Sequence, residues 1–243
     1  MSSTDCDSWT ETPENLLAFG RGDVAMGWWR RVWSSAARLS LRNPSRRVRL
    51  TLPGWNEDAP DDDLRIWRDP EGDVLSLASG RSSYPLGSDE MEQRRWCRKL
   101  AQSRGGGLIE VQAMPGGMGP SATLIYKRLQ CPAYVYTGMF ITSAQGVSLI
   151  WTIVACERGV TGVREAVVTA TLMEAGTLTL DGYKRWWAQD PYDPAYQGVD
   201  RSVLRFMSDD ECYDQQFPKH PLSKVRRVLS ELPGNMQFDS QGP

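Results

Sequence analysis

The segment from residue 108 to residue 156 constrains the fold most, because it contains four successive stretches with the composition of β-strands. These stretches are rich in β-branched and aromatic residues, and glycine- and proline-bearing turns separate them. The last two are joined by a short polar connection around Gln145, which favours an antiparallel hairpin. The pattern therefore predicts a meander with strands at Leu108–Met114, Ala122–Leu129, Ala133–Thr142 and Val147–Cys156.

Two helices are predicted beside this meander. Asp89 followed by Glu92 has the pattern of a capping box, which opens a helix that runs to Ser103. After the meander, Thr161 is expected to cap a helix over Val163–Glu174, and the next glycine is expected to end it. Apolar residues keep helical spacing along this second helix, at Val163, Ala166, Val167, Ala170 and Met173.

Strands are also predicted ahead of the meander. The alternating stretch Arg46–Leu52 reads as a strand that ends at a Pro-Gly pair. Leu64–Trp67 and Val74–Ala78 then form a predicted hairpin around a turn that contains proline and glycine.

The C-terminal third adds two short helices to the prediction. Ser208 with Glu211 repeats the capping-box pattern and predicts a helix over Asp209–Phe217. A second helix is expected over Pro221–Leu232, closed by the Pro-Gly pair that follows. A run of strands flanked by helices, without βαβ alternation, predicts an α+β fold with an antiparallel sheet.

The composition suits one large domain. Of the 243 residues, 40% are hydrophobic and 24% are charged, which is ordinary for a globular chain. We expect residues 1–20 to be a loose polar leader and residues 21–243 to form a single α+β domain. Within it, residues 46–175 form the predicted core, and residues 176–236 form a predicted aromatic and helical extension.

The cysteines and the apolar stretches indicate the compartment. The odd number of scattered cysteines argues against a disulfide framework and fits a reducing compartment. The longest apolar stretch, Val147–Cys156, is too short to span a bilayer. The expected location is therefore the cytoplasm. The cysteines are Cys6, Cys97, Cys131, Cys156 and Cys212.

The element order resembles that of the PsbP/DcrB-like fold, an antiparallel sheet flanked by helices. The likeness is topological, covers residues 46–175 and begins at the segment Val48–Trp55. Members of that superfamily are mostly binding or accessory proteins: photosystem assembly factors, small-GTPase binders and chaperones for secreted effectors. The resemblance implies a non-enzymatic role and assigns no specific residue.

An arginine- and tryptophan-rich stretch, Val24–Leu41, precedes the predicted core. Its helical period places tryptophans on one face and arginines on the other. Such a helix suits an acidic protein groove or an anionic membrane surface, although an ordinary helix packed on the sheet has the same pattern. The candidate binding residues here are Trp28, Trp29, Arg30, Arg31 and Trp33.

A second aromatic stretch lies in the C-terminal extension, where aspartates and prolines interleave with aromatic side chains. Aromatic rings near carboxylates can hold a cationic partner or a sugar. The alternative is that the rings anchor the extension to the sheet. The candidate binding residues are Trp186, Trp187, Tyr192 and Tyr196.

Catalytic candidates are few. The single histidine, His220, is the residue that general-base chemistry would require, with Cys212 and Asp214 as its nearest reactive companions. The spacing matches no zinc pattern, and the glycine clusters lack the lysine and hydroxyl of a phosphate loop. The simpler interpretation is that His220 caps the last helix, with Pro221 at its first position. No metal and no cofactor is predicted.

These features favour a non-enzymatic binding or accessory protein: a bacterial-type adaptor, chaperone or immunity-like factor that acts through contacts with a protein partner. The net charge of −2 gives no reason to expect nucleic acid. Two alternatives stay open: an enzyme of unfamiliar type that uses Cys212 and His220, and a peripheral membrane binder that uses the Val24–Leu41 helix.

Overall fold

The computed structural model divides the chain into two compact units, Met1–Leu41 and Arg42–Pro243. It describes residues 44–58, 64–80, 84–85, 89–114, 120–130, 133–144, 147–181, 187–198 and 200–238, all within the second unit. The predicted leader and the predicted Val24–Leu41 helix lie outside the described residues.

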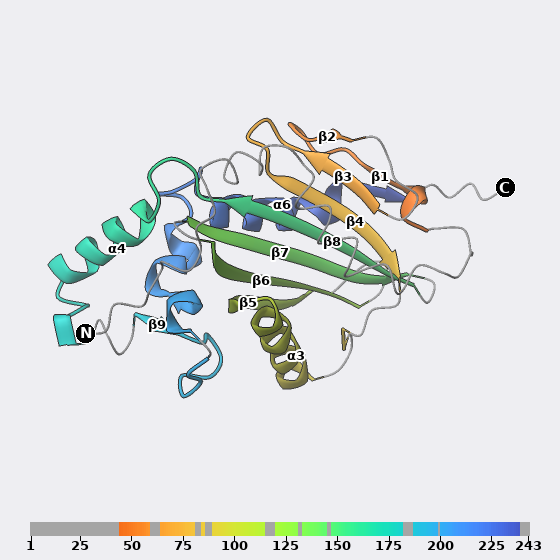
Figure 1. Cartoon of the computed structure of the whole chain (residues 1–243). Coiled ribbons are helices and arrows are strands. Elements are labelled where there is room, and N and C mark those ends of the chain that lie inside the picture. Colours follow the sequence, from red (N-terminus) through yellow and green to blue (C-terminus); the bar gives the residue numbers. More distant parts are fainter. Residues whose placement is uncertain are drawn as a thin grey trace, which may run out of the picture. The chain divides into compact units, whose positions relative to one another are not determined.

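The second unit contains a seven-stranded antiparallel sheet with the order β2-β3-β4-β8-β7-β6-β5 (Figure 1). Strands β5 to β8, which follow one another along the chain, form the expected meander, and the expected hairpin β3–β4 joins it by pairing β4 with β8. The predicted α+β fold with an antiparallel sheet is thereby confirmed. The strands are β2 (Asn56–Glu57), β3 (Leu64–Arg68), β4 (Val74–Gly80), β5 (Gly106–Met114), β6 (Ser121–Gln130), β7 (Ala133–Ala144) and β8 (Val147–Cys156).

Among the described residues, three α-helices flank the sheet. Helix α3 (Glu90–Ser103) lies beside β5, and α6 (Pro221–Asn235) crosses β7 and β8. A Cβ on Gly138 would collide with Val225 and Leu229, so the glycine lets α6 approach the middle of β7 closely. The third helix, α4 (Val163–Glu174), stands at one end of the sheet in Figure 1.

The main core lies between α6 and the sheet. The predicted C-terminal extension therefore supplies part of this core, because the buried face of α6 packs against β4, β7 and β8. The apolar side chains of α6 that lie in it are Leu222, Val225, Val228, Leu229 and Leu232, and they meet Leu75, Leu77, Tyr136, Phe140, Trp151 and Ile153.

Two short strand pairs lie outside the large sheet. The predicted strand Arg46–Leu52 is reduced to β1 (Val48–Leu50), which pairs with β11 (Met236–Phe238) near the C-terminus. Farther along, β9 (Ala188–Gln189) pairs with β10 (Arg205–Phe206). Both pairings join residues far apart in sequence, and each strand is three residues or shorter.

The helix ends partly follow the sequence signals. Asp89 caps α3 as expected, because its side chain accepts a hydrogen bond from the Glu92 backbone N–H. Thr161 does not cap α4. That position belongs to Gly162, which has a φ of 71°, and the Glu157 carboxylate accepts the Gly162 N–H at 3.0 Å.

The predicted helix over Asp209–Phe217 was wrong. The structure has two 3-10 turns there, η5 (Met207–Asp209) and η6 (Glu211–Tyr213). Asp210, not Ser208, accepts the capping hydrogen bond, from the Cys212 N–H. Helix α6 also runs past the expected stop: it continues through Pro233 to Asn235 and ends where β11 pairs with β1.

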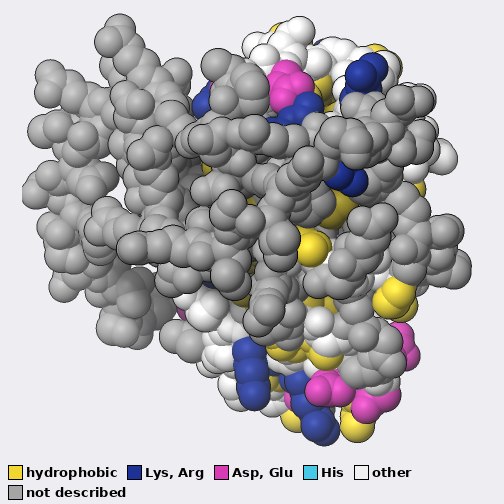
Figure 2. All heavy atoms as spheres, turned by 90° about the vertical axis from the view of Figure 1, so that its right-hand side faces the viewer, with side chains coloured by type: hydrophobic (Ala, Val, Ile, Leu, Met, Phe, Trp, Pro, Cys, Tyr) yellow, Lys and Arg dark blue, Asp and Glu magenta, His cyan; other side chains and the backbone are white. Residues whose placement is uncertain are grey.

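The described residues visible in Figure 2 include both positively and negatively charged side chains. Figure 2 views the end of the molecule opposite α4, and there Lys and Arg side chains lie beside Asp and Glu side chains at the lower edge. Of the helices that the structure describes, none combines the length and apolar character that crossing a bilayer requires.

Candidate interaction surface

The outward face of α4 is apolar over its first two turns and ends in the exposed polar residues Thr171 and Glu174. Val163 and Val167 are 45% and 38% exposed, and Ala166 and Ala170 beside them are exposed as well. We call these four residues the α4 outer face. Two further exposed apolar side chains flank the helix in sequence: Val160 ahead of it, at 82%, and Leu180 behind it, at 80%. A surface helix ordinarily presents polar side chains to water, so this orientation needs a cause.

The cause is a buried arginine on the inward side of the same helix. Arg164 is fully buried, and Val168 is the other fully buried side chain of α4. Leu172 and Met173 pack against a small cluster formed by Leu178, Trp187 and Phe206. The helix therefore turns a mixed face inward and leaves its apolar stripe outside.

Every donor nitrogen of Arg164 has an acceptor. Nε donates to the carbonyl of Ser208 at 2.6 Å, and Nη2 donates to the carbonyl of Asp210 at 2.8 Å. Nη1 donates to Asp214 Oδ1 and to Ser223 Oγ, both at 2.8 Å. Rolling α4 to bury its valines would break these contacts and strand a buried charge, which costs several kcal/mol.

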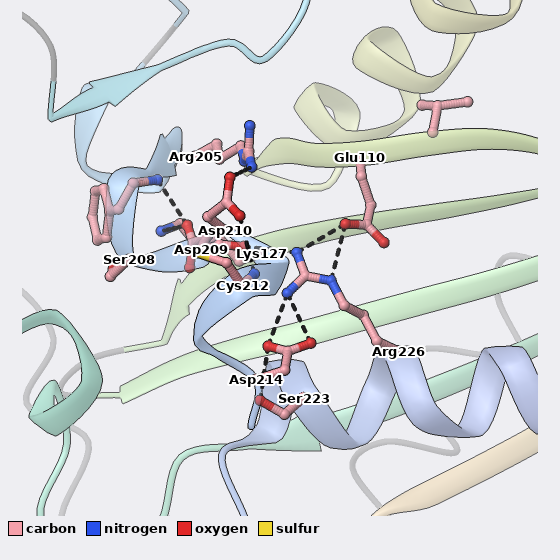
Figure 3. Close-up of polar contacts among 12 residues, drawn as sticks. Glu110, Lys127, Arg205, Ser208, Asp209, Asp210, Cys212, Asp214, Ser223 and Arg226 are labelled. Carbon is pink, nitrogen blue, oxygen red and sulfur yellow. Dashed lines mark hydrogen bonds and ion pairs between the residues drawn. The ribbon is translucent and has the colours of Figure 1, made fainter. Parts of the chain in front are cut away.

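Arg226 of α6 also contacts the segment of residues 207–214 that holds Arg164, and Figure 3 shows its contacts with Asp214 and Glu110. Its guanidinium donates to Glu110 Oε2 at 2.8 and 3.0 Å and to both oxygens of Asp214 at 3.0 and 3.2 Å. Asp214 thus bridges two arginines, one from α4 and one from α6. Charged hydrogen bonds hold residues 207–214 between these helices and β5, and Met207 adds an apolar contact with the cluster of Leu178, Trp187 and Phe206.

A second ion pair lies deeper. Lys127 of β6 and Asp209 are both fully buried, and Lys127 Nζ lies 2.6 Å from Asp209 Oδ2. The ammonium also lies over the Phe206 ring, 3.1 Å from its centroid. Burial lowers the pKa of Lys127, against the opposing effect of Asp209. This pair anchors the C-terminal segment to the sheet.

Each of the three catalytic candidates has its own set of contacts in the structure. Asp214 is engaged by arginines, and Cys212 is exposed, with a thiol pKa that desolvation and the neighbouring Asp210 raise. His220 caps α6: its Nδ1 accepts the Leu222 N–H at 3.2 Å. Within the described part of the chain, no hydrogen bond or ion pair joins any two of these three residues. A raised thiol pKa also disfavours the nucleophilic thiolate.

One set of side chains has the composition of a metal site: Glu157, Glu165 and His220, whose ligand atoms lie within 4.8 Å of one another. The hydrogen bond from Leu222 N–H occupies the Nδ1 lone pair, so the proton of a neutral imidazole lies on Nε2. Nε2 then faces Glu157 Oε1 at 3.6 Å as a donor and offers no lone pair to a metal. These residues do not fit a metal ion in this arrangement.

A second acidic set, Asp69, Glu71 and Asp73, lies in the β3–β4 turn. The Lys224 ammonium is in contact with all three carboxylates, 2.8 Å from Asp69 and 2.6 Å from Asp73. Arg158 also pairs with Asp73 at 2.6 Å. Side-chain cations thus already occupy the place that a metal ion would take.

The described residues of the second aromatic stretch contact the rest of the domain. Trp187 is 6% exposed and stacks on Phe206. The Tyr192 hydroxyl accepts from the Val111 N–H at 2.7 Å and donates to the Val111 carbonyl at 3.1 Å, so it occupies the open edge of β5. Tyr196 lies over the Arg98 guanidinium. Trp186 and the candidates Trp28, Trp29, Arg30, Arg31 and Trp33 lie outside the described residues.

The sequence prediction did not include the α4 outer face among its candidate sites. The signal was present, because Val163, Ala166, Val167 and Ala170 were recognised at helical spacing. Spacing identifies a stripe but does not tell whether the stripe faces the core or the solvent. That choice depends on Arg164, whose acceptors lie 44 to 59 residues further along the chain.

Comparison with known proteins adds a fold-level likeness only. No family model and no curated protein matches the chain. The Ran-binding protein Mog1p of Saccharomyces cerevisiae is 7% identical and covers 80% of this chain and 92% of its own, with a TM-score of 0.41. LpqN of Mycobacterium tuberculosis, involved in cell envelope biogenesis, is 14% identical, covers 54% of this chain and 78% of its own, and has a TM-score of 0.27. The resemblance to the PsbP/DcrB-like fold is not confirmed by these matches.

Proposed function

We propose that this chain is a non-enzymatic accessory protein that binds another protein through the α4 outer face. The observation that carries the proposal is the apolar stripe of Val163, Ala166, Val167 and Ala170, which a fully buried arginine holds toward solvent. The predicted aromatic surfaces, Trp28–Trp33 and Trp186–Tyr196, remain proposals for additional contacts.

The orientation of α4 supports a docking role on energetic grounds. Covering apolar surface stabilises a complex by about 25 cal/mol per Å², so a half-exposed valine contributes on the order of 1 kcal/mol when a partner buries it. The helix is also fixed before binding, because Arg164 is fully hydrogen-bonded. A pre-ordered surface loses little conformational entropy on association.

Site-specific photo-crosslinking tests this proposal in native extract. A photoreactive amino acid at position 167 is expected to give a discrete adduct with one protein, identified by mass spectrometry. The same amino acid at Lys99, an exposed position of α3, serves as the control and is expected to give no such adduct.

The variant Val163→Asp should abolish the adduct formed from position 167. Aspartate at the first position of α4 is favourable to the helix dipole, so the fold is preserved. Met91→Asp replaces an exposed apolar residue in the first turn of α3 by the same acid and should leave the adduct unchanged. An adduct insensitive to Val163→Asp, or equal labelling from Lys99, would refute docking through α4.

A further inference from the structure

We infer that the partner surrounds α4 with a concave apolar groove whose rim is basic. This inference rests on the proposed function and specifies what binds the α4 outer face. Three observations support it: the size of the face, the size of its side chains, and the charges around it.

The face is small. Helix α4 has 12 residues and is therefore about 18 Å long. A second copy of this helix laid against it would cover one stripe of alanines and half-buried valines. Such a contact removes on the order of several hundred Å² from solvent, below the roughly 1,200 Å² of a stable interface. A groove that also contacts both flanks of the helix buries more surface from the same 12 residues.

The side chains suit a narrow groove. Ala166 and Ala170 lie beside the valines, along one side of the stripe, and keep the helix slim there, so a groove wall can approach the backbone closely. The exposed Val160 and Leu180 continue the apolar sequence beyond both ends of the helix. A groove slightly longer than α4 would therefore have apolar contacts along its whole length.

The exposed charges at the C-terminal end of this face are negative, whereas the exposed Arg158 near its N-terminal end is paired with Asp73. Between Val160 and Asp181, all of which the structure describes, the charged residues in the exposed class are Glu174 and Asp181. Arg164 in the same segment is buried. The carbonyl groups at the C-terminal end of α4 add partial negative charge beside Glu174. Lysine or arginine on the groove rim complements this end, whereas an anionic membrane surface would be repelled by it.

Charge reversal in the crosslinking assay tests the groove. Glu174→Lys combined with Asp181→Lys is expected to lower the adduct yield from position 167 about fivefold at low salt. The loss should shrink at high salt, because exposed charge pairs are screened. Glu231→Lys, an exposed charge reversal on α6, is the matched control and should have no effect.

The other outcomes overturn the inference in distinguishable ways. If the double charge reversal leaves the adduct yield at the wild-type level, the basic rim is refuted, whereas docking of a protein on α4 still stands. An adduct with the mass of two chains, together with a dimer in light scattering, identifies a second copy instead. Co-flotation of the protein with vesicles that contain phosphatidylserine, lost in Val163→Asp, identifies a membrane. The absence of any adduct at position 167 refutes the proposed function itself.

Discussion

Replacing Arg164 by methionine should destabilise the domain by about 4 kcal/mol. The side chain is fully buried and makes four hydrogen bonds, two to the carbonyls of Ser208 and Asp210 and two to Asp214 and Ser223. Methionine retains most of the apolar contact but leaves the two carbonyl groups without this donor. Asp214 keeps Arg226, which limits the loss.

Urea unfolding followed by far-UV circular dichroism measures this change. Arg158→Met is the matched control, because Arg158 also pairs with an aspartate but is 44% exposed; its loss should cost at most about 1 kcal/mol. Arg164→Lys should lie between wild type and Arg164→Met, since an ammonium cannot reach acceptors spread around a planar guanidinium. If Arg164→Met costs no more than Arg158→Met, the argument that Arg164 fixes α4 fails.

Three further predictions concern polar groups outside α4's outer face. Tyr192→Phe removes both hydrogen bonds to Val111 and should cost about 1–2 kcal/mol, with faster amide exchange at Val111 and unchanged exchange in β8; equal exchange at Val111 would contradict the edge-capping role. His220→Ala should cost about 1 kcal/mol through the lost cap and His220→Asn much less, and equal losses in the two would point to another role. Burial, with Glu157 nearby, raises the pKa of Glu165, so its stabilising contribution is complete below the unfolded-state pKa and is lost as pH rises through the folded-state pKa. The stability of Glu165→Gln relative to wild type should therefore increase with pH in urea titrations, and a pH-independent difference would show that Glu165 is not perturbed.

The strands of the meander could be predicted because each carries its own signal. In β7 and β8 the residues alternate between the α6 side and the opposite side, and glycine-bearing turns mark their ends. Helix α3 could be predicted equally well, since Asp89 and Glu92 are three residues apart and their capping contact is local. Signals of this kind require no knowledge of the rest of the chain.

The pairing of the short strands could not be predicted, because their partners are distant in sequence. Strand β1 exists through pairing with β11, and nothing in Val48–Leu50 specifies residues 236–238. The capping box at Ser208 failed for a related reason. The Asp209 side chain is held by Lys127 and by the backbone of Phe206, and Asp210 caps the following turn, so the backbone takes two 3-10 turns instead of one helix.

The same long-range contacts explain why the interaction surface was harder to predict than the fold. If position 164 carried leucine, α4 could bury that side chain or roll its valines inward, and either arrangement would satisfy the hydrophobic pattern. A guanidinium matched to four acceptors on two other segments removes this freedom, because any rotation leaves a charge buried without partners. The arginine thus selects one rotation of the helix at the expense of apolar burial. A chain that gains nothing from an exposed apolar stripe would be expected to carry an apolar residue at position 164 and to bury the valines. The orientation of α4, more than the number of apolar residues on it, therefore argues for a partner.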